Sequence, residues 1–130
     1  MIEDRKEMLL SYIKANVVPI LIDFEDDLLN DAVVLRADIG TDELNGHYKG
    51  KKFSPPKWFN DIVNLKDKRI LVIDKIDTIS KEEQLKFGEL LEYRKISTFD
   101  LPKNCVIIVT ANEINKDKIN EEIFSLLAQI

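Results

Sequence analysis

The sequence predicts a single α/β domain built on a small, mostly parallel sheet, and three observations lead to this fold class. The chain has 130 residues and 45% hydrophobic content, enough for one compact core. Four short apolar runs do not alternate with polar residues, which is typical of strands buried on both faces. Segments with helical periodicity separate these runs, as in sheets covered by helices. We therefore expect one domain over residues 1–130.

The first elements are expected to be a helix and two strands. Apolar residues recur at helical spacing over 2–15. The apolar run 18–22 reads as a strand, with Pro19 near its start, where a missing N–H is tolerated. A second strand is expected over 33–38. The glycines and prolines between residues 40 and 56 indicate one long loop or a pair of turns.

The second half of the chain continues the alternation of strands and helices. Ser80 and Glu83 have the spacing of a capping box, in which the two residues satisfy free N–H groups at a helix start. The further apolar patterns predict strands over 70–74 and 105–110 and helices over 58–65, 80–94 and 116–127. Each strand is thus preceded or followed by a helical segment, as a covered parallel sheet requires.

Composition excludes several classes of function. The chain has 19 basic and 24 acidic residues and a net charge of −5, which excludes a globally basic nucleic-acid binder. No apolar run reaches about 18 residues, so we expect no membrane span. One cysteine, Cys105, and one histidine, His47, exclude a disulfide framework and zinc sites built on several cysteines or on paired histidines. We expect a soluble cytoplasmic protein without a metal site.

Polar residues stand at the carboxyl ends of the predicted strands, where parallel sheets bind their ligands. Three strands end at or near Asp23, Asp38 and Asp74, and the fourth ends in Thr110-Ala111-Asn112. The segment 70–77 has four hydrophobic residues followed by Asp74, the Walker B pattern in which an aspartate holds Mg²⁺. The alternative is that aspartate simply favours the turns that follow strands.

From about residue 33 to the end, the chain resembles AAA+ ATPases of the MoxR-like group. Five pieces occur in the family's order: an acid-Leu-x-Gly stretch within 38–46, a Pro-Pro-x-Trp turn within 53–59, the Walker B-like segment 70–77, Leu-Pro at 101–102, and a helix over 121–130. The resemblance implies a three-layer P-loop-NTPase-like core with strand order 1-4-3-2. In contrast to the family, we expect this core to be truncated, without a lid domain and without the fifth strand of the sheet. It also places Asn112 at sensor 1, beside Asp74.

The parts that hold and hydrolyse nucleotide depart from the family pattern. Residues 23–31 carry five carboxylates and no glycine or base, where a Walker A loop would cradle phosphate. Lys75 replaces the Walker B glutamate and is expected to pair with Asp74 or Asp77. No arginine follows Arg94 to act as a finger. We expect a pseudo-ATPase with no catalytic residue, in which Asp74, Lys75 and Asn112 are nucleotide-site remnants.

Three functions stay open on the sequence alone. The favoured interpretation is a non-catalytic AAA+-like interaction or regulatory module, which needs no cofactor and binds a protein partner such as another AAA+ subunit. The alternative is a component of an AAA+ ATPase that binds ATP and Mg weakly or at a composite subunit interface. The third is a partner or nucleic-acid patch, although packing of its aromatics on the core is favoured; it comprises Tyr48, Lys49, Lys51, Lys52 and Trp58.

Overall fold

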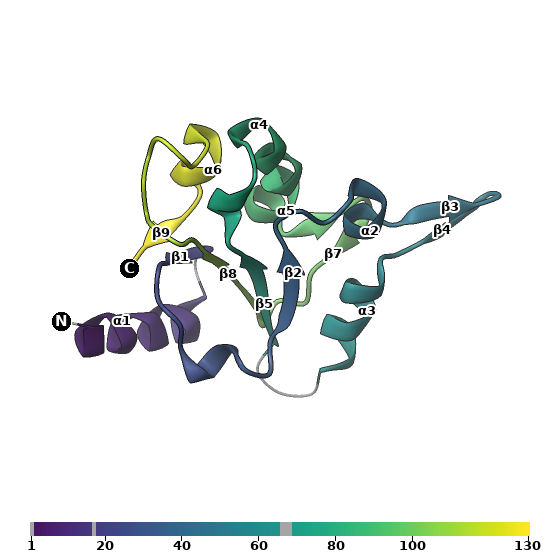
Figure 1. The fold of residues 1–130 in the computed structure, drawn as a ribbon. Coiled ribbons are helices and arrows are strands. Elements are labelled where there is room, and N and C mark those ends of the chain that lie inside the picture. The colour runs from purple at the N-terminus through teal and green to yellow at the C-terminus, as the bar shows by residue number, and fades with distance from the viewer. Residues whose placement is uncertain (1, 17, 66–68) are drawn as a thin grey trace.

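The computed structural model describes residues 2–16, 18–65 and 69–130 and has a parallel sheet at its centre (Figure 1). Among the described residues, this sheet has five strands in the order β2-β5-β8-β1-β9, and all of its pairings are parallel. The strands are β1 (Ile20–Ile22), β2 (Val33–Arg36), β5 (Arg69–Asp74), β8 (Cys105–Thr110) and β9 (Ala128–Gln129). The α/β class and the order 1-4-3-2 of the four predicted strands are thus confirmed.

The fifth strand, β9, corrects the expectation that the sheet would lack one. Ala128 and Gln129 pair with Ile20 and Leu21 of β1. The N–H of Ala128 donates to Pro19 O at 2.8 Å, so the proline that cannot donate still contributes an acceptor to the sheet. Two residues are too few to show strand periodicity, which is why the pattern did not reveal β9.

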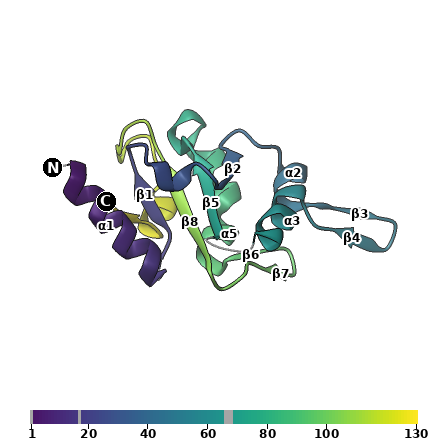
Figure 2. The same ribbon diagram turned by 90° about the horizontal axis from the view of Figure 1, so that it is seen from below.

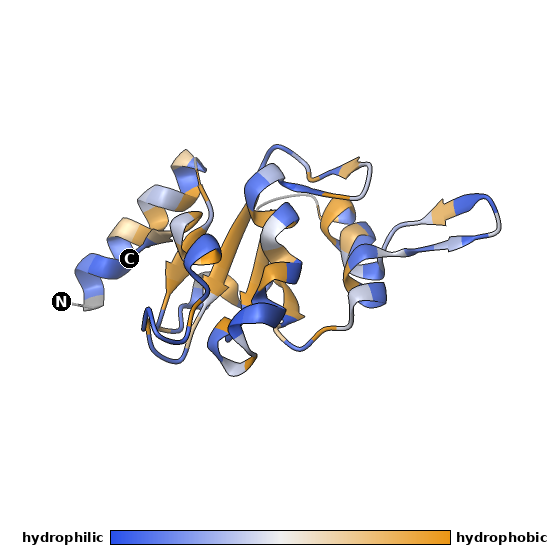
Figure 3. Ribbon diagram, turned by 90° about the horizontal axis from the view of Figure 1, so that it is seen from above, coloured by the Kyte–Doolittle hydropathy of each residue, from blue (hydrophilic) through white to orange (hydrophobic). Residues whose placement is uncertain are grey.

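Helices cover the two faces of the sheet unequally (Figure 2). The helix α1 (Ile2–Ala15) lies over one face, where its Leu9 and Ile13 pack in the smaller of two core clusters. The larger cluster lies on the other face, beneath α3 (Lys57–Asn64), α4 (Lys81–Gln84), α5 (Gly88–Tyr93) and α6 (Glu121–Ser125). Successive side chains of a strand point to opposite faces, so the apolar residues of β5 contribute to both clusters. Figure 3 shows that the strands of the central sheet are mostly hydrophobic.

The sequence indicated one long loop or a pair of turns between residues 40 and 56, and this prediction is wrong. The segment forms a short helix and a hairpin that projects from the body (Figure 1): α2 (Thr41–Asn45), β3 (His47–Lys49) and β4 (Lys52–Ser54). Gly46 has φ +81°, and a Cβ there would lie 2.4 Å from Ser54 O. Gly50 has φ +63° at the first of the two residues between the strands, a position at which a type II′ turn requires glycine.

The helices expected over 2–15 and 58–65 are confirmed as α1 and α3, whereas two others are shorter than predicted. The helix over 80–94 divides into α4, a 3₁₀ turn η3 (Leu85–Phe87) and α5, after a start at which Ser80 Oγ accepts the Glu83 N–H at 3.1 Å. The helix over 116–127 reduces to α6. Asn120 Oδ1 accepts the N–H groups of Glu122 and Ile123, so the helix begins at that cap.

The remaining described elements join these parts. A second small hairpin, β6 (Lys95–Ile96) and β7 (Phe99–Asp100), lies between α5 and β8, and 3₁₀ turns η1 (Asp27–Leu29) and η2 (Ile76–Thr78) follow β1 and β5.

Cys105 opens β8 and is buried, as predicted. Burial raises the pKa of its thiol to about 11, although Arg94 and Arg69 oppose the shift. No helix in the described part of the chain has the length and apolar character to cross a membrane.

Candidate functional site

The carboxyl ends of β1, β5 and β8 border a hollow of about 500 Å³, here called the strand-end hollow. Residues from the segment 23–30 line one side of it. Asp74, Lys75 and the stretch 110–112 line the other side. Ligands of parallel α/β sheets bind at this edge, so the hollow is the candidate site.

The ends of β5 and β8 are joined through the side chain of Thr110. Its hydroxyl donates to Asp74 Oδ1 at 2.9 Å and accepts the backbone N–H of Lys75 at 2.8 Å. Lys75 has the left-handed backbone conformation, with φ 55°, and its Nζ donates to Asn112 Oδ1 at 3.3 Å. The structure therefore brings together the predicted residues Asp74, Lys75 and Asn112 at neighbouring strand ends.

The ion pair predicted between Lys75 and Asp74 or Asp77 is not formed between these described residues. The ammonium contacts the amide of Asn112 instead, while both carboxylates are hydrogen-bonded elsewhere. Adjacent charges in the sequence suggested pairing. In the structure, β5 lies beside β8, so Thr110 and the turn after β8 provide the hydrogen-bond partners of Asp74, Lys75 and Asp77.

Asp77 organises the turn after β8, a role that sequence reasoning missed. Its two carboxylate oxygens accept the N–H of Asn112 at 3.0 and 3.1 Å, and one also accepts the N–H of Glu113 at 3.2 Å. Asp77 belongs to η2, directly after β5. In the sequence, Asp77 is marked only by its position three residues after Asp74. That spacing does not predict a hydrogen bond to Asn112, which lies 35 residues further along the chain.

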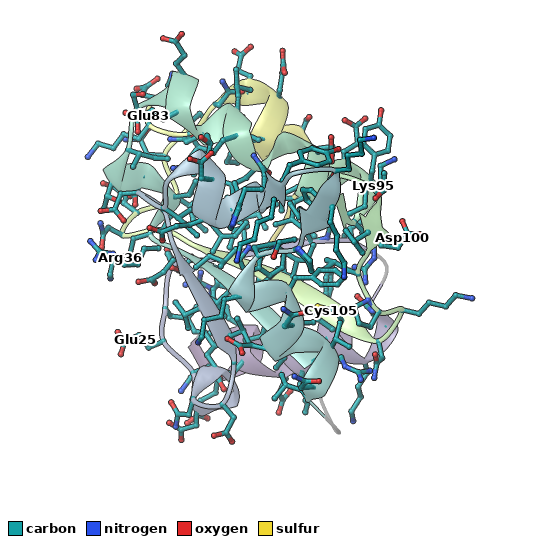
Figure 4. All side chains as sticks on the ribbon, turned by 90° about the vertical axis from the view of Figure 1, so that its right-hand side faces the viewer. Glu25, Arg36, Glu83, Lys95, Asp100 and Cys105 are labelled. Atoms are coloured by element: carbon teal, nitrogen blue, oxygen red, sulfur yellow. The ribbon has the colours of Figure 1, made fainter. Side chains whose placement is uncertain are left out.

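The segment 23–31 presents carboxylates to the strand-end hollow. Asp23, Glu25 and Asp26 line the hollow together with Asp74, and Lys75 is the one basic residue in the described lining. Asp23 forms an ion pair with Arg5 of α1, which fixes the start of the segment. Figure 4 shows the Glu25 side chain extending outward from the ribbon. A phosphate near these groups would meet repulsion of about 1 kcal/mol or more per close charge pair.

The basic patch lies on the projecting hairpin, apart from the strand-end hollow. Tyr48, Lys49, Lys51 and Lys52 are all exposed there. Tyr48 stands opposite Phe53 across the two strands, and Lys49 stands opposite Lys52. Because side chains alternate along each strand, the two rings occupy one face of the hairpin and the two ammonium groups the other.

The aromatic residues of this region differ in how they pack. Phe53 stacks on Phe99 of β7, with ring centroids 5.4 Å apart. Trp58 is buried, and its Nε1 donates to Leu44 O at 2.9 Å, so it does not share the exposed surface of the lysines. Tyr48 is 69% exposed. The favoured expectation of aromatics packed on the core therefore holds for Phe53 and Trp58 and is wrong for Tyr48.

No protein-family model matches this sequence, and no match is found among curated proteins. In the part of the chain that the structure describes, no three His, Cys, Asp or Glu side chains are placed to hold a metal ion. What the strand-end hollow can bind therefore follows from its own residues. They offer several carboxylates, one ammonium and hydrogen-bonded strand ends, an arrangement that disfavours a polyanion.

Proposed function

We propose that this chain is a non-catalytic AAA+-like interaction module, whose α/β core serves as a scaffold for a protein partner. The observation that carries the proposal is the acidic side of the strand-end hollow. Asp23, Glu25 and Asp26 stand where a nucleotide-binding loop would place backbone N–H groups around phosphate. The segment 23–31 also has no glycine that would let its backbone approach a phosphate closely.

The strand order supports an ATPase-type core without requiring ATPase chemistry. β1, β8, β5 and β2 are adjacent in the order that the family resemblance implies, and β9 adds a further parallel strand beside β1. Asp74 and Asn112 stand on neighbouring strand ends. A core of this kind hosts unrelated functions, because function depends on the site rather than on the fold.

Lys75 argues further against hydrolysis. It occupies the position at which the family has a glutamate that activates water, and an ammonium has no lone pair to accept a proton. Its Nζ is also engaged with Asn112. Positioning supplies most of the catalysis in phosphoryl transfer, so a base alone achieves little where no group holds the phosphates.

The hairpin favours a protein partner over single-stranded nucleic acid. Sequence-tolerant binding of a single strand combines base stacking with phosphate contacts along one track. Here Tyr48 and Phe53 lie on the opposite face from Lys49 and Lys52. Phe53 is further engaged with Phe99, which leaves one exposed ring for stacking.

Phosphate release from Mg²⁺-ATP tests the proposal in the wild type and in Lys75→Glu. We expect no turnover above background in either protein, because the substitution restores a base without a phosphate cradle. Lys75→Gln is the matched control, since it removes the ammonium without adding a base. Turnover by Lys75→Glu alone contradicts the proposal. Turnover only after other AAA+ subunits are added supports the composite-site alternative, with ATP and Mg as cofactors.

A further inference from the structure

The outer edge of the sheet at β2 carries unpaired strand groups. Ala37 N–H donates to Asp74 O at 3.2 Å, and Leu35 pairs with Ile73 in parallel register. The backbone groups of a strand alternate between its two sides, so Leu35 and Ala37 turn toward β5. The N–H and C=O of Val34 and the N–H of Arg36 consequently point to the free edge. β2 is the terminal strand on that side of the described sheet.

Two adjoining hollows extend along this edge, and together they form what we call the edge groove. The larger, of about 830 Å³, lies between β2 and residues of α2, β3 and α3. The smaller, of about 340 Å³, continues past Arg36 to Gly40. They share Val34, Leu35, Ile39 and Glu43, so the groove borders the whole of β2. Figure 4 shows Arg36 extending outward at this border of the molecule.

The groove combines apolar side chains with an acidic rim. Val34, which is 52% exposed, contributes apolar surface on one face of β2, and the half-buried Ile39 contributes apolar surface on the other face. Two of the lining carboxylates are already in ion pairs, Asp38 with Arg36 at 2.8 Å and Asp61 with Lys57 at 3.4 Å. The other two, from the first turn of α2, form no ion pair with any described residue: Asp42 and Glu43.

We propose that the edge groove binds an extended segment of a partner protein, which adds to the sheet as a strand beside β2 and carries alternating basic and apolar side chains. The N–H groups of Val34 and Arg36 and the C=O of Val34 point to the free edge with the spacing of a strand. An extended segment is the backbone conformation that can pair with all three. Its apolar side chains lie on the face of the sheet that carries Val34, and its basic side chains lie on the opposite face, beside Asp42 and Glu43 of α2. The inference rests on the proposed interaction function and names the chemistry of the partner.

Peptide binding followed by fluorescence anisotropy tests the groove directly. The probe is a short labelled peptide of alternating lysine and valine, and the controls are a glutamate–valine peptide and a backbone N-methylated lysine–valine peptide. We expect saturable binding of the first, no binding of the acidic peptide, and about fivefold weaker binding of the methylated one, which has lost strand donors. Equal binding of the acidic and basic peptides overturns the inference.

Two variants of this chain locate the binding. Glu43→Lys is expected to weaken binding of the lysine–valine peptide by about tenfold, whereas Glu82→Lys makes the same charge change on α4, away from the groove, and is expected to have little effect. Val34→Pro removes an N–H that faces the edge and is expected to weaken binding about fivefold, while Val34→Thr keeps that N–H. Far-ultraviolet circular dichroism verifies folding. Unchanged affinity in both Glu43→Lys and a folded Val34→Pro overturns the inference.

Two further results separate the candidate occupants and the two proposals. Dimerisation of the wild type that Glu43→Lys abolishes shows that a second copy fills the groove, which overturns the assignment to a partner protein. ATP turnover by the chain alone contradicts the proposed function whatever the peptide does. Absence of peptide binding in a chain that also lacks turnover removes the groove inference and leaves the proposed function in place.

Discussion

The two sides of the strand-end hollow differ in how their polar groups are used. On the side of β5 and β8, Asp74 and Asp77 accept hydrogen bonds from neighbouring groups. On the side of the segment 23–31, Glu25 extends outward and Asp26 lines the hollow beside it. Carboxylates on the first side thus accept from backbone and hydroxyl groups of the neighbouring strand end, whereas on the second side Asp23 pairs with Arg5 and the exposed Glu25 adds to the negative potential that an approaching ligand meets.

In the proposed AAA+-like interpretation, the resemblance stops between these two sides. It begins at about residue 33 and includes β5 and β8, whose ends keep an ordered arrangement around Thr110. The segment 23–31 precedes it and carries the charges that oppose a polyphosphate. The comparison teaches that hydrogen bonds between strand ends can fix their geometry independently of what the neighbouring segment offers to a ligand.

The largest effect is expected at Asp77. Asp77→Ala removes a half-buried carboxylate that accepts the N–H groups of Asn112 and Glu113, and should lower the free energy of unfolding by about 2–3 kcal/mol. Urea-induced unfolding measures it. Asp77→Asn keeps one oxygen acceptor and should lose less. A loss below about 0.5 kcal/mol for Asp77→Ala would show that this side is not held by the carboxylate.

A smaller effect is expected at Thr110. Thr110→Val keeps the shape of the side chain and removes the hydroxyl that donates to Asp74 and accepts from the Lys75 N–H. Unfolding free energy should fall by about 1–2 kcal/mol, because two hydrogen bonds are lost and a backbone donor is left without its partner. Thr110→Ser retains the hydroxyl and serves as the control. Equal stability of the valine and serine variants would contradict the assigned role.

The smallest effect is expected at Glu25. Its side chain is exposed and extends outward, so Glu25→Lys should change the unfolding free energy by less than about 0.5 kcal/mol. The same urea titration compares it with Asp77→Ala. A loss as large as that of Asp77→Ala would erase the contrast between the two sides of the hollow.

The central sheet was predictable because its longest strands are continuous apolar runs in the sequence. β5 and β8 are apolar runs buried on both faces, and few other arrangements accommodate such runs. The hairpin β3–β4 was not predictable in this way. Three exposed lysines mask the strand pattern there, and Gly50 is compatible with many turns besides the one observed. Helix α6 was overestimated because Asn120 acts as a cap inside an otherwise helical pattern.

The candidate site was predictable only in part. Asp74 and Asn112 follow from strand ends, and their proximity depends on the adjacency of β5 and β8. The partner of Lys75 did not follow, because Asn112 is distant in the sequence while Asp74 and Asp77 are near. The edge groove left no signal in the sequence, since it depends on which backbone groups of β2 face outward and on where α2 and α3 lie.

Binding of Mg²⁺-ATP tests the central claim, the lack of a phosphate cradle, most directly. Thermal unfolding is followed with Mg²⁺-ATP at about 1 mM and with Mg²⁺ alone as the control. A site with a Kd of about 10 µM would stabilise the chain by about 2.7 kcal/mol, a shift of several degrees for a domain of this size. We predict that ATP raises Tm by less than about 2 °C beyond the effect of Mg²⁺. A shift of several degrees would contradict the account.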